Sequence, residues 1–279
     1  MPSTILVTGS NKGIGYEAVK LLSVQLPDAT ILLGSRSTQN GNEAIQKMKS
    51  SDLSHPFTNI KVLELDITAP SSLASAVEHI QSTYHTLDFL IHNSGISELD
   101  GDIKHAAIFD VNVRGTKATI DAFLPIITPH TGKITVVSSQ VGSWYQHGVN
   151  DEIRNEFEDI DNVTWEKVEG WMQDWETIAA GEQSKAPWIP LEEPVGTRYM
   201  ASKGMLNPWL RNFAKTHKEI QLAVVCPGYC ATDLNGFAGT RPAEKGGESI
   251  IWPTFNEFES GKFYYDGKEV GYDQPVFAI

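Results

Sequence analysis

The sequence predicts an α/β fold in which a doubly wound parallel sheet carries a helical insertion, and three observations support this prediction. Short apolar and β-branched runs alternate with segments of helical period along the 279 residues, which is typical of strands joined by crossover helices. The predicted strands are almost continuously apolar, as in a parallel sheet that helices cover on both faces. One strongly acidic segment interrupts the alternation and marks the insertion.

The predicted elements follow one another in regular order. Six strands are expected at residues 4–8, 29–33, 60–65, 87–91, 133–137 and 222–226. The helices between them are indicated by apolar faces at Ile14, Ala18, Leu21 and Leu22, at residues 44–48, at Leu73, Val77 and Ile80, and at residues 111–123 and 199–214. Because crossovers between parallel strands are right-handed, these elements build a Rossmann-like sheet. We expect a single domain over residues 1–279.

The acidic segment is expected to form the helical insertion, over residues 143–196. Between Asn150 and Glu193 there are 13 acidic residues and three basic ones. Asn150 can cap one helix, which carries Ile153, Phe157 and Ile160 on one face. Residues 168–175 repeat apolar side chains at i, i+3, i+4 and i+7, which predicts a second amphipathic helix. Such stripes usually pack into the core; the alternative is that the two helices also wall a pocket.

Composition excludes several classes of protein. The 35 acidic residues outnumber the 22 basic ones, and the net charge of −13 argues against nucleic acid as a partner. No apolar run is long enough to span a membrane, and the N-terminus lacks the pattern of a signal peptide. Two cysteines fit a reducing compartment, and we expect a cytoplasmic protein. Cys226 and Cys230 lack the spacing and the histidine partners of a metal site, so no metal is expected.

A glycine-rich turn lies between the first predicted strand and the first helix. Its residues are Thr8, Gly9, Ser10, Asn11, Lys12, Gly13, Ile14 and Gly15. Glycine permits positive φ and a close backbone approach to a pyrophosphate, and the helix N-terminus presents free N–H groups to the anion. A nucleoside triphosphate loop needs Lys followed by Ser or Thr after its last glycine, whereas Tyr16 stands there. The turn therefore predicts a dinucleotide site, with an ordinary glycine turn as the alternative.

The end of the second strand indicates which dinucleotide would bind. NAD-binding folds usually place an acidic residue there, to hold the ribose 2′-hydroxyl. Here Ser35 and Arg36 follow the strand, and no acid is present. Either Arg36 or Lys12 alone could be a solvated surface residue, but together they would neutralise a 2′-phosphate, which favours NADP(H).

A Tyr-x3-Lys motif, formed by Tyr199 and Lys203, opens the last long helix. This spacing places both side chains on one helix face. A unit charge ~4 Å from the phenol contributes up to about 4 kcal/mol at an effective dielectric near 20, so the ammonium is expected to lower the pKa of Tyr199. Ser139 ends the fifth strand at the carboxyl edge of the sheet, where ligands bind such folds.

Together with Asn112 and the segment from His92 to Gly95, these motifs resemble the short-chain dehydrogenase/reductase family over nearly the whole chain outside the acidic segment. The resemblance implies that Tyr199 is the general acid and that Ser139 orients the substrate oxygen. It implies that Lys203 binds the nicotinamide ribose and lowers the pKa of Tyr199, and that Asn112 holds a water of the proton relay. Besides the glycine turn, Arg36, Tyr199 and Lys203, the implied cofactor contacts are Asp66, Ile67, Asn93, Gly95, Pro227, Gly228, Cys230 and Thr232.

Two departures from the family pattern matter. His92 stands where the family commonly has Asn, and we interpret it as a packed strand-end residue without a catalytic role. The 59 residues between Ser139 and Tyr199 form a far longer link than most relatives have. This insertion between the catalytic Ser and Tyr, with the Asn11-Lys12-Gly13 loop, resembles the carbonyl reductase branch. That branch implies NADPH as the cofactor and a monomer, because the inserted helices cover the surface that relatives use for oligomers.

Three functions are compatible with these patterns. The first is an NADPH-dependent reductase of a medium-sized, mostly apolar aldehyde or ketone, with a pocket lined by Trp144, Tyr145, the inserted helices and residues 235–241. The alternative is a non-enzymatic NADP-sensing protein that uses the acidic insertion as an interaction surface, although such a protein need not keep the complete catalytic set. A sugar-nucleotide epimerase is the third, and the 47 residues after Thr232 are short for its substrate domain.

Overall fold

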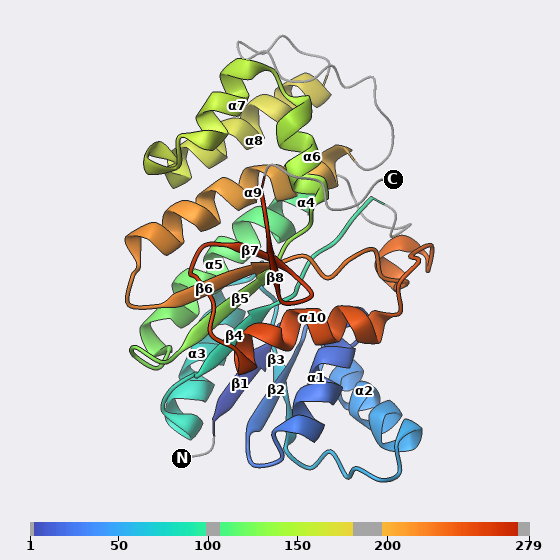
Figure 1. Cartoon of the computed structure of the whole chain (residues 1–279). Helices are drawn as coiled ribbons and strands as arrows, with labels where there is room; N and C mark the ends of the chain where they lie inside the picture. Colours follow the sequence, from blue (N-terminus) through green and yellow to red (C-terminus); the bar gives the residue numbers. More distant parts are fainter. Residues whose placement is uncertain (1–2, 99–106, 181–196, 273–279) are drawn as a thin grey trace.

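One eight-stranded sheet forms the centre of the part of the chain that the computed structural model describes, residues 3–98, 107–180 and 197–272. The strand order is β3-β2-β1-β4-β5-β6-β7-β8. The strands are β1 (Thr4–Val7), β2 (Thr30–Ser35), β3 (Ile60–Glu64), β4 (Phe89–His92), β5 (Lys133–Val137), β6 (Gln221–Val225), β7 (Phe263–Tyr265) and β8 (Lys268–Val270). All neighbours pair in parallel except β7 and β8, which are antiparallel. This arrangement confirms the predicted α/β fold (Figure 1).

Helices cover both faces of this sheet. In chain order they are α1 (Gly13–Gln25), α2 (Thr38–Ser51), α3 (Pro70–Tyr84), α4 (Ala107–Phe109), α5 (Gly115–Phe123), α6 (Val141–Gly148), α7 (Asp151–Glu158), α8 (Trp165–Ala179), α9 (Thr197–Thr216) and α10 (Ala243–Phe255). Successive strand residues point to opposite faces. Ile5 and Val7 therefore pack with α1, α2 and α10, whereas Leu6 packs with α3, α5 and α9. The two separate cores are what a doubly wound sheet requires.

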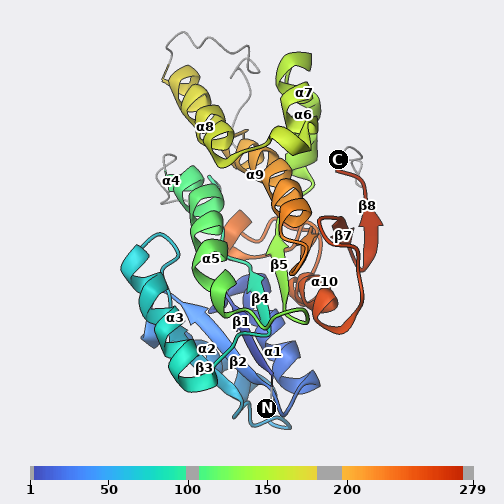
Figure 2. The ribbon, with the colours of Figure 1, turned by 90° about the vertical axis from the view of Figure 1, so that its left-hand side faces the viewer.

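The described part of the insertion forms α6, α7 and α8. Figures 1 and 2 show α7 and α8 beyond α9, at the end of the molecule away from the N-terminus. The Asn150 side chain caps α7 by accepting a hydrogen bond from the Ile153 N–H at 2.9 Å, as predicted. The apolar stripe of α8 is buried, with Trp171 and Trp175 only 3% and 5% exposed. The stripe therefore packs into the core. Ile160 belongs to a short 3-10 turn after α7 rather than to the helix itself.

Three features of the fold differ from the sequence-based expectation. The predicted helix over residues 111–123 contains a π-turn, Asp110–Arg114, where the Gly115 N–H donates to the Asp110 carbonyl. Strands β7 and β8 and helix α10 were not predicted. Helix α10 contains Pro253 and two adjacent glycines, which have low helix propensity. It forms because it packs closely on α1: a Cβ on Gly247 would lie 3.0 Å from the Ala18 nitrogen.

Within the described ranges, no helix is both long and apolar enough to cross a membrane.

Candidate active site

The predicted site residues gather at one edge of the sheet. Because β1, β4, β5 and β6 are parallel, the segments that follow them all leave the sheet at its carboxyl edge. These segments begin at Thr8, Asn93, Ser138 and Cys226. Helix α9 crosses the same edge with its N-terminal half, which brings the Tyr-x3-Lys motif to these strand ends.

The glycine turn after β1 has the conformation that a dinucleotide site needs. Gly9 and Gly13 have φ angles of +60° and +61°, which side chains with a Cβ rarely adopt. A Cβ on Gly9 would lie 2.8 Å from the Ser94 Oγ, and one on Gly15 would lie 2.5 Å from the Asn93 Nδ2. Helix α1 then begins without a side-chain cap and without an acid in its first turn. Its free N–H groups and positive dipole end can therefore receive an anion, so the turn fits a pyrophosphate.

Hydrogen bonds from Asn93 and from a residue of the turn itself hold this turn in place. The Asn93 amide donates to the carbonyls of Thr8 and Gly9, both at 3.0 Å. The Ser10 hydroxyl is fully buried and donates to the Val7 carbonyl at 2.7 Å, which fixes the turn to the end of β1. Asn11 and Lys12 line a groove of about 430 Å³, whose other walls come from α1, α2 and residues 231–243.

The basic residues predicted for a 2′-phosphate differ in their surroundings. Arg36 follows β2 directly, is exposed, and makes no ion pair with any residue in the described ranges. Lys12 lies 4.0 Å from the Asp233 carboxylate, an acidic neighbour that the sequence did not reveal. Both side chains of that pair are about half exposed, and such surface pairs contribute at most about 1 kcal/mol. Lys12 can therefore leave Asp233 for a phosphate at little cost.

Asp66 and Ile67 follow β3 at the same edge. The Asp66 Oδ1 accepts hydrogen bonds from the backbone N–H and the hydroxyl of Thr68, at 2.9 and 2.7 Å, which fixes the turn. Ile67 is buried against α5: a Cβ on Gly115 would lie 2.9 Å from the Ile67 Cδ1.

The structure brings Ser139, Tyr199 and Lys203 together. The Ser139 side chain lies near the Tyr199 phenol and acts to lower its pKa. The Lys203 Nζ lies 5.8 Å from the centroid of the Tyr199 ring and donates to the Val137 carbonyl at 3.0 Å. Neighbouring Ser138 is buried and donates to the Asn207 Oδ1 at 2.6 Å, so only Ser139 of this pair is partly accessible.

Burial controls the protonation of the Tyr-Lys pair. It raises the pKa of the Tyr199 phenol, with smaller contributions from the Cys226 thiol and the Glu98 carboxylate in the same direction. It lowers the pKa of Lys203 to about 8. The direction is opposite to the predicted lowering of the Tyr199 pKa, because desolvation of the buried phenol is the largest effect on it. The neutral phenol that results is the form that can donate a proton.

Asn112 lies in the middle of the π-turn and is completely buried. Its amide forms two hydrogen bonds with the backbone of Ile96, one to the N–H and one to the carbonyl, both 2.9 Å long. It also donates to the Ser202 hydroxyl at 3.1 Å, which in turn donates to the Tyr199 carbonyl at 2.7 Å. The side chain is thus occupied in holding neighbouring segments, and π-turns of this kind are frequent at functional sites. Ser202 was missed, although it lies within the Tyr-x3-Lys motif.

Helix α6, which follows Ser139, packs closely on α9. A Cβ on Gly142 would lie 2.7 Å from the Lys203 carbonyl carbon, and a Cβ on Gly204 would lie 2.5 Å from the Tyr145 Cδ1. Tyr145 is therefore buried against α9, at 2% exposure, and cannot line an open pocket as predicted. Trp144, the preceding residue of α6, is half-buried.

The segment after β6 closes over the glycine turn. Gly228 has a φ of +83°, and Cys230 and Thr232 are nearly buried. A Cβ on Gly13 would lie 3.5 Å from the Thr232 Cγ2, so the segment lies directly against the turn. The Pro227 carbonyl accepts a hydrogen bond from the Cys230 thiol.

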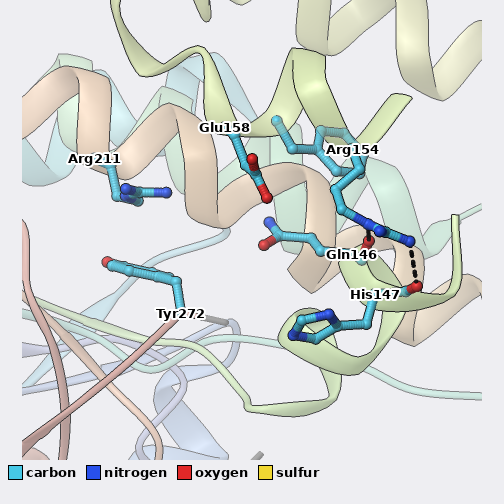
Figure 3. Close-up of a pocket in the computed structure, with 7 residues that line it drawn as sticks. Gln146, His147, Arg154, Glu158, Arg211 and Tyr272 are labelled. Atoms are coloured by element: carbon cyan, nitrogen blue, oxygen red, sulfur yellow. Dashed lines mark hydrogen bonds between the residues drawn. The ribbon is translucent and has the colours of Figure 1, made fainter. Parts of the chain in front are cut away.

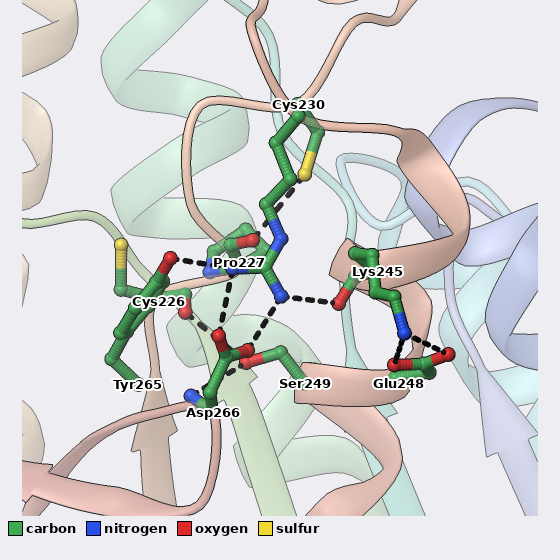
Figure 4. Close-up of polar contacts among 9 residues, drawn as sticks. Cys226, Pro227, Cys230, Lys245, Glu248, Ser249, Tyr265 and Asp266 are labelled. Carbon is green, nitrogen blue, oxygen red and sulfur yellow. Dashed lines mark hydrogen bonds and ion pairs between the residues drawn. The ribbon is translucent and has the colours of Figure 1, made fainter.

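Arg241 ties this segment to the C-terminal hairpin. Figure 4 shows Tyr265 and Asp266 of the hairpin near Pro227 and Ser249. Its guanidinium donates to both carboxylate oxygens of Asp266, at 2.8 and 2.6 Å, and to the Lys245 carbonyl at 2.9 Å. Its backbone pairs with Tyr229 and Ala231, which closes the neck of the loop over residues 232–240. Phe237 in this loop is 65% exposed.

His92 behaves as the packed residue that was predicted. It is buried and its Nε2 lies 2.9 Å from the Thr116 hydroxyl, which donates to the Asn112 carbonyl. The Nε2 therefore carries the proton. Burial, together with the nearby Lys203 charge, lowers the pKa of His92 to about 3, so the ring stays neutral. In the described part of the chain no three His, Cys, Asp or Glu side chains gather as a metal site would require.

A second cavity, of about 40 Å³, lies between α6, α7, α9 and the C-terminal segment (Figure 3). Arg154 in its wall donates to the carbonyls of His147 and Val149, at 2.8 and 3.0 Å. Arg211 lies over the Tyr272 ring, 4.8 Å from its centroid. None of the predicted site residues lines the cavity. Its arginines are occupied by contacts with neighbouring segments of the chain, so we assign the cavity no chemistry.

Comparisons with known proteins agree with this geometry. A family model described as short chain dehydrogenase matches residues 3–150. Short-chain dehydrogenase/reductase 1 of Saponaria officinalis is 30% identical over 273 residues, which cover 88% of this chain and 87% of that protein. Carbonyl reductase (NADPH) 1 of Mus musculus is 28% identical over 280 residues, with 94% and 96% covered.

The fold agrees as well. The structure of salutaridine reductase from Papaver somniferum superposes with a TM-score of 0.77 at 24% identity, covering 95% of this chain and 99% of that one. The resemblance read from the motifs is thus confirmed on most of the chain. The protein is an oxidoreductase and belongs to the short-chain dehydrogenase/reductase family.

Proposed function

We propose that the protein is an NADPH-dependent reductase, which transfers a hydride to the carbonyl carbon of an aldehyde or ketone. One arrangement carries the proposal: the partly accessible phenol of Tyr199, with Ser139 near it and the buried Lys203 on the same helix face, lies at the sheet edge that also carries the uncapped glycine turn. A proton donor beside a dinucleotide site is what carbonyl reduction needs.

The residues have distinct roles in this proposal. The nicotinamide supplies the hydride when the cofactor is bound. Tyr199 gives its proton to the carbonyl oxygen as charge develops there, and the Ser139 hydroxyl, which lies near the phenol, orients that oxygen. With the cofactor bound, Lys203 would hold the nicotinamide ribose, and Asn112 would hold a water of the proton relay. The Asn112 amide is occupied by Ile96 and Ser202, and the Asn112 carbonyl already accepts a hydrogen bond from the Thr116 hydroxyl, so the water would share that carbonyl oxygen with Thr116.

The preference for NADPH rests on the end of β2. Arg36 is exposed there, no acid occupies its position, and Lys12 is held only by a surface pair. The double variant Arg36→Glu with Lys12→Ala should therefore lose most of the preference for NADPH over NADH, measured as a ratio of kcat/KM values. An unchanged ratio would contradict the assignment. The related mouse protein is named an NADPH carbonyl reductase, which favours the same cofactor.

We propose a medium-sized, mostly apolar substrate. The loop over residues 232–240 presents Phe237, and the segment beside it presents Tyr229, which is 52% exposed. Half-buried Trp144 follows Ser139 by five residues. Apolar walls with few polar groups suit such a carbonyl compound. A panel of aldehydes, diketones, quinones and cyclic ketones tests this directly, and faster turnover of small polar carbonyl compounds would contradict it.

The proposal includes one catalytic domain, with the segment 143–196 as its insertion, that acts as a monomer. Its support is that α8 packs over the π-turn: Arg114 donates to both Glu169 oxygens from Nε and Nη2, with the shortest distance 2.8 Å. A surface used in this way is not free for a second copy. Light scattering should give the mass of a single chain.

A cytoplasmic location is also proposed, because both cysteines are free thiols.

No observation favours the alternative of a non-enzymatic NADP sensor. A protein that only binds the dinucleotide would not need a buried lysine and a neutral phenol at the same sheet edge. Tight NADPH binding without turnover of any carbonyl compound in the panel would favour the sensor instead.

A further inference from the structure

We propose that Glu98 is a positioning residue for Tyr199, whose carboxylate holds the first turn of α9, and the phenol with it, through the Tyr199 backbone N–H. The inference rests on the proposed role of Tyr199 as general acid.

The contact joins two distant segments. The Glu98 Oε1 accepts a hydrogen bond from the Tyr199 N–H at 2.9 Å, across 101 residues of sequence. The first turn of α9 contains no acid of its own. Free N–H groups at a helix start favour a negative charge, and a carboxylate that accepts from one forms a strong, short hydrogen bond. Glu98 therefore provides, from another segment, the negative charge that the first turn of α9 lacks.

The segment that carries Glu98 is itself fixed. Ile96, two residues earlier, is bonded at both its N–H and its carbonyl to the Asn112 amide. The Ser97 hydroxyl donates to the Leu234 carbonyl at 2.7 Å. The backbone that carries the Glu98 carboxylate is therefore fixed, and the hydrogen bond to the Tyr199 N–H fixes the start of α9 relative to it.

Tyr199 is held on both sides of its own backbone by this network. Glu98 accepts from its N–H, and Ser202 donates to its carbonyl while accepting from Asn112. Asn112 is thus connected to Tyr199 by two routes, one through Ile96 and Glu98 and the other through Ser202. The arrangement fixes the residue whose phenol must meet the substrate oxygen, and an error of about 1 Å in such a group can lower a rate by about 10²-fold.

The second carboxylate oxygen gives Glu98 an electrostatic effect as well. Oε2 is buried and has no hydrogen-bond partner in the described part of the chain. The charge raises the pKa of the Tyr199 phenol. The other groups that face the phenol are the Ser139 hydroxyl, the Cys226 thiol and the Lys203 ammonium, while Arg198 and, beyond it, Glu176 flank Glu98. Removing only the charge should therefore lower the pKa of Tyr199.

Three variants of the full chain separate these effects. Glu98→Ala removes the hydrogen bond and the charge, and should lower kcat by about 10-fold or more while the KM for NADPH changes by less than about threefold. Glu98→Gln keeps an acceptor for the Tyr199 N–H, so kcat near neutral pH should stay within about threefold, but the alkaline limb of the pH profile should move to lower pH.

The matched control is Asp88→Ala. The Asp88 Oδ2 accepts from the Thr4 N–H at 2.7 Å, an equally long-range carboxylate–backbone bond at the opposite edge of the sheet. This variant should lower Tm and leave both kcat and the pH profile unchanged. Tyrosinate absorbance, titrated in each variant against Tyr199→Phe, gives a readout that does not depend on turnover.

The outcomes discriminate between the hypotheses. The inference is overturned if Glu98→Ala keeps the wild-type kcat, if Glu98→Gln loses as much activity as Glu98→Ala, or if neither the alkaline limb nor the tyrosinate titration moves in Glu98→Gln. If Glu98→Ala does not fold, the Glu98→Gln measurements decide alone. Full activity in Tyr199→Phe would instead refute the proposed function. If Tyr199→Phe loses activity but the Glu98 variants keep the activity and pH profile of wild type, only this inference is refuted.

Discussion

Replacing Lys203 with Met should stabilise the protein near neutral pH while it abolishes turnover. Lys203 is 4% exposed, and burial lowers its pKa from 10.5 to about 8. Below that pH the folded protein must desolvate an ammonium that water solvates in the unfolded chain, which costs roughly 3 kcal/mol. Met keeps the unbranched shape without the charge. It leaves the Val137 carbonyl without its donor, a loss of about 1 kcal/mol, so the net gain near pH 7 is about 2 kcal/mol.

The sign of the pH dependence follows from the same values. Between pH 8 and 10.5 the unfolded chain binds a proton at Lys203 that the folded protein has released. The stability contributed by this group therefore rises with pH across that window and is constant below it. Lys203→Met lacks this rise of about 1.4 kcal/mol per pH unit, so its advantage of about 2 kcal/mol should shrink above pH 8 and be gone at about pH 9.5. By pH 10.5 the variant should be less stable than wild type by about 1 kcal/mol, which is the hydrogen bond to Val137 that it has lost.

Denaturant unfolding without added cofactor, at several pH values, measures the difference. In thermal melts near neutral pH the variant should gain about 3 °C, given the unfolding entropy expected for a chain of this length. The control is Lys133→Met at the other end of β5, where the ammonium donates to the Pro253 and Asn256 carbonyls and lies 3.7 Å from Glu257. That variant should be less stable than wild type. A Lys203→Met protein that is also less stable at pH 7 would refute the reasoning.

Two further predictions concern the packing around the site. Gly204→Ala should lower both Tm and kcat, because its Cβ would lie 2.5 Å from the buried Tyr145 ring, and overpacking of about 1–3 kcal/mol outweighs the ~1 kcal/mol gained in helix propensity; a rise in Tm would show that propensity prevails. Arg241→Met should speed chymotrypsin cleavage after Phe237, because the loop over residues 232–240 loses its tie to Asp266. An unchanged cleavage rate would show that the backbone pairing of the neck suffices.

The sequence predicted the parts of the fold that local pattern controls. Apolar periodicity and capping chemistry are local properties of the sequence. They were therefore enough to predict six strands, the order of the crossover helices and the Asn150 cap. Helix α10 was not readable, since its glycines and Pro253 oppose helix formation and only the close contact with α1 stabilises it. The three-residue strands β7 and β8 are too short for a period to emerge.

The same division holds for the site. Spacing on one helix predicted that Tyr199 and Lys203 lie together, but not that burial would raise the pKa of the phenol. The rotation of α6, which turns Tyr145 onto Gly204, depends on tertiary packing that the sequence does not display. Glu98 lies 101 residues from the residue it holds, and nothing near it in the sequence marks that contact.

The most direct test of the central claim is the reduction of a carbonyl compound by wild type and by Tyr199→Phe, followed by the loss of NADPH absorbance. NADPH binding, measured separately by fluorescence, controls for an intact cofactor site. If Tyr199 is the general acid, the variant should bind NADPH as wild type does and lose about 10²–10⁴-fold in kcat. A variant that turns over at nearly the wild-type rate would contradict the account.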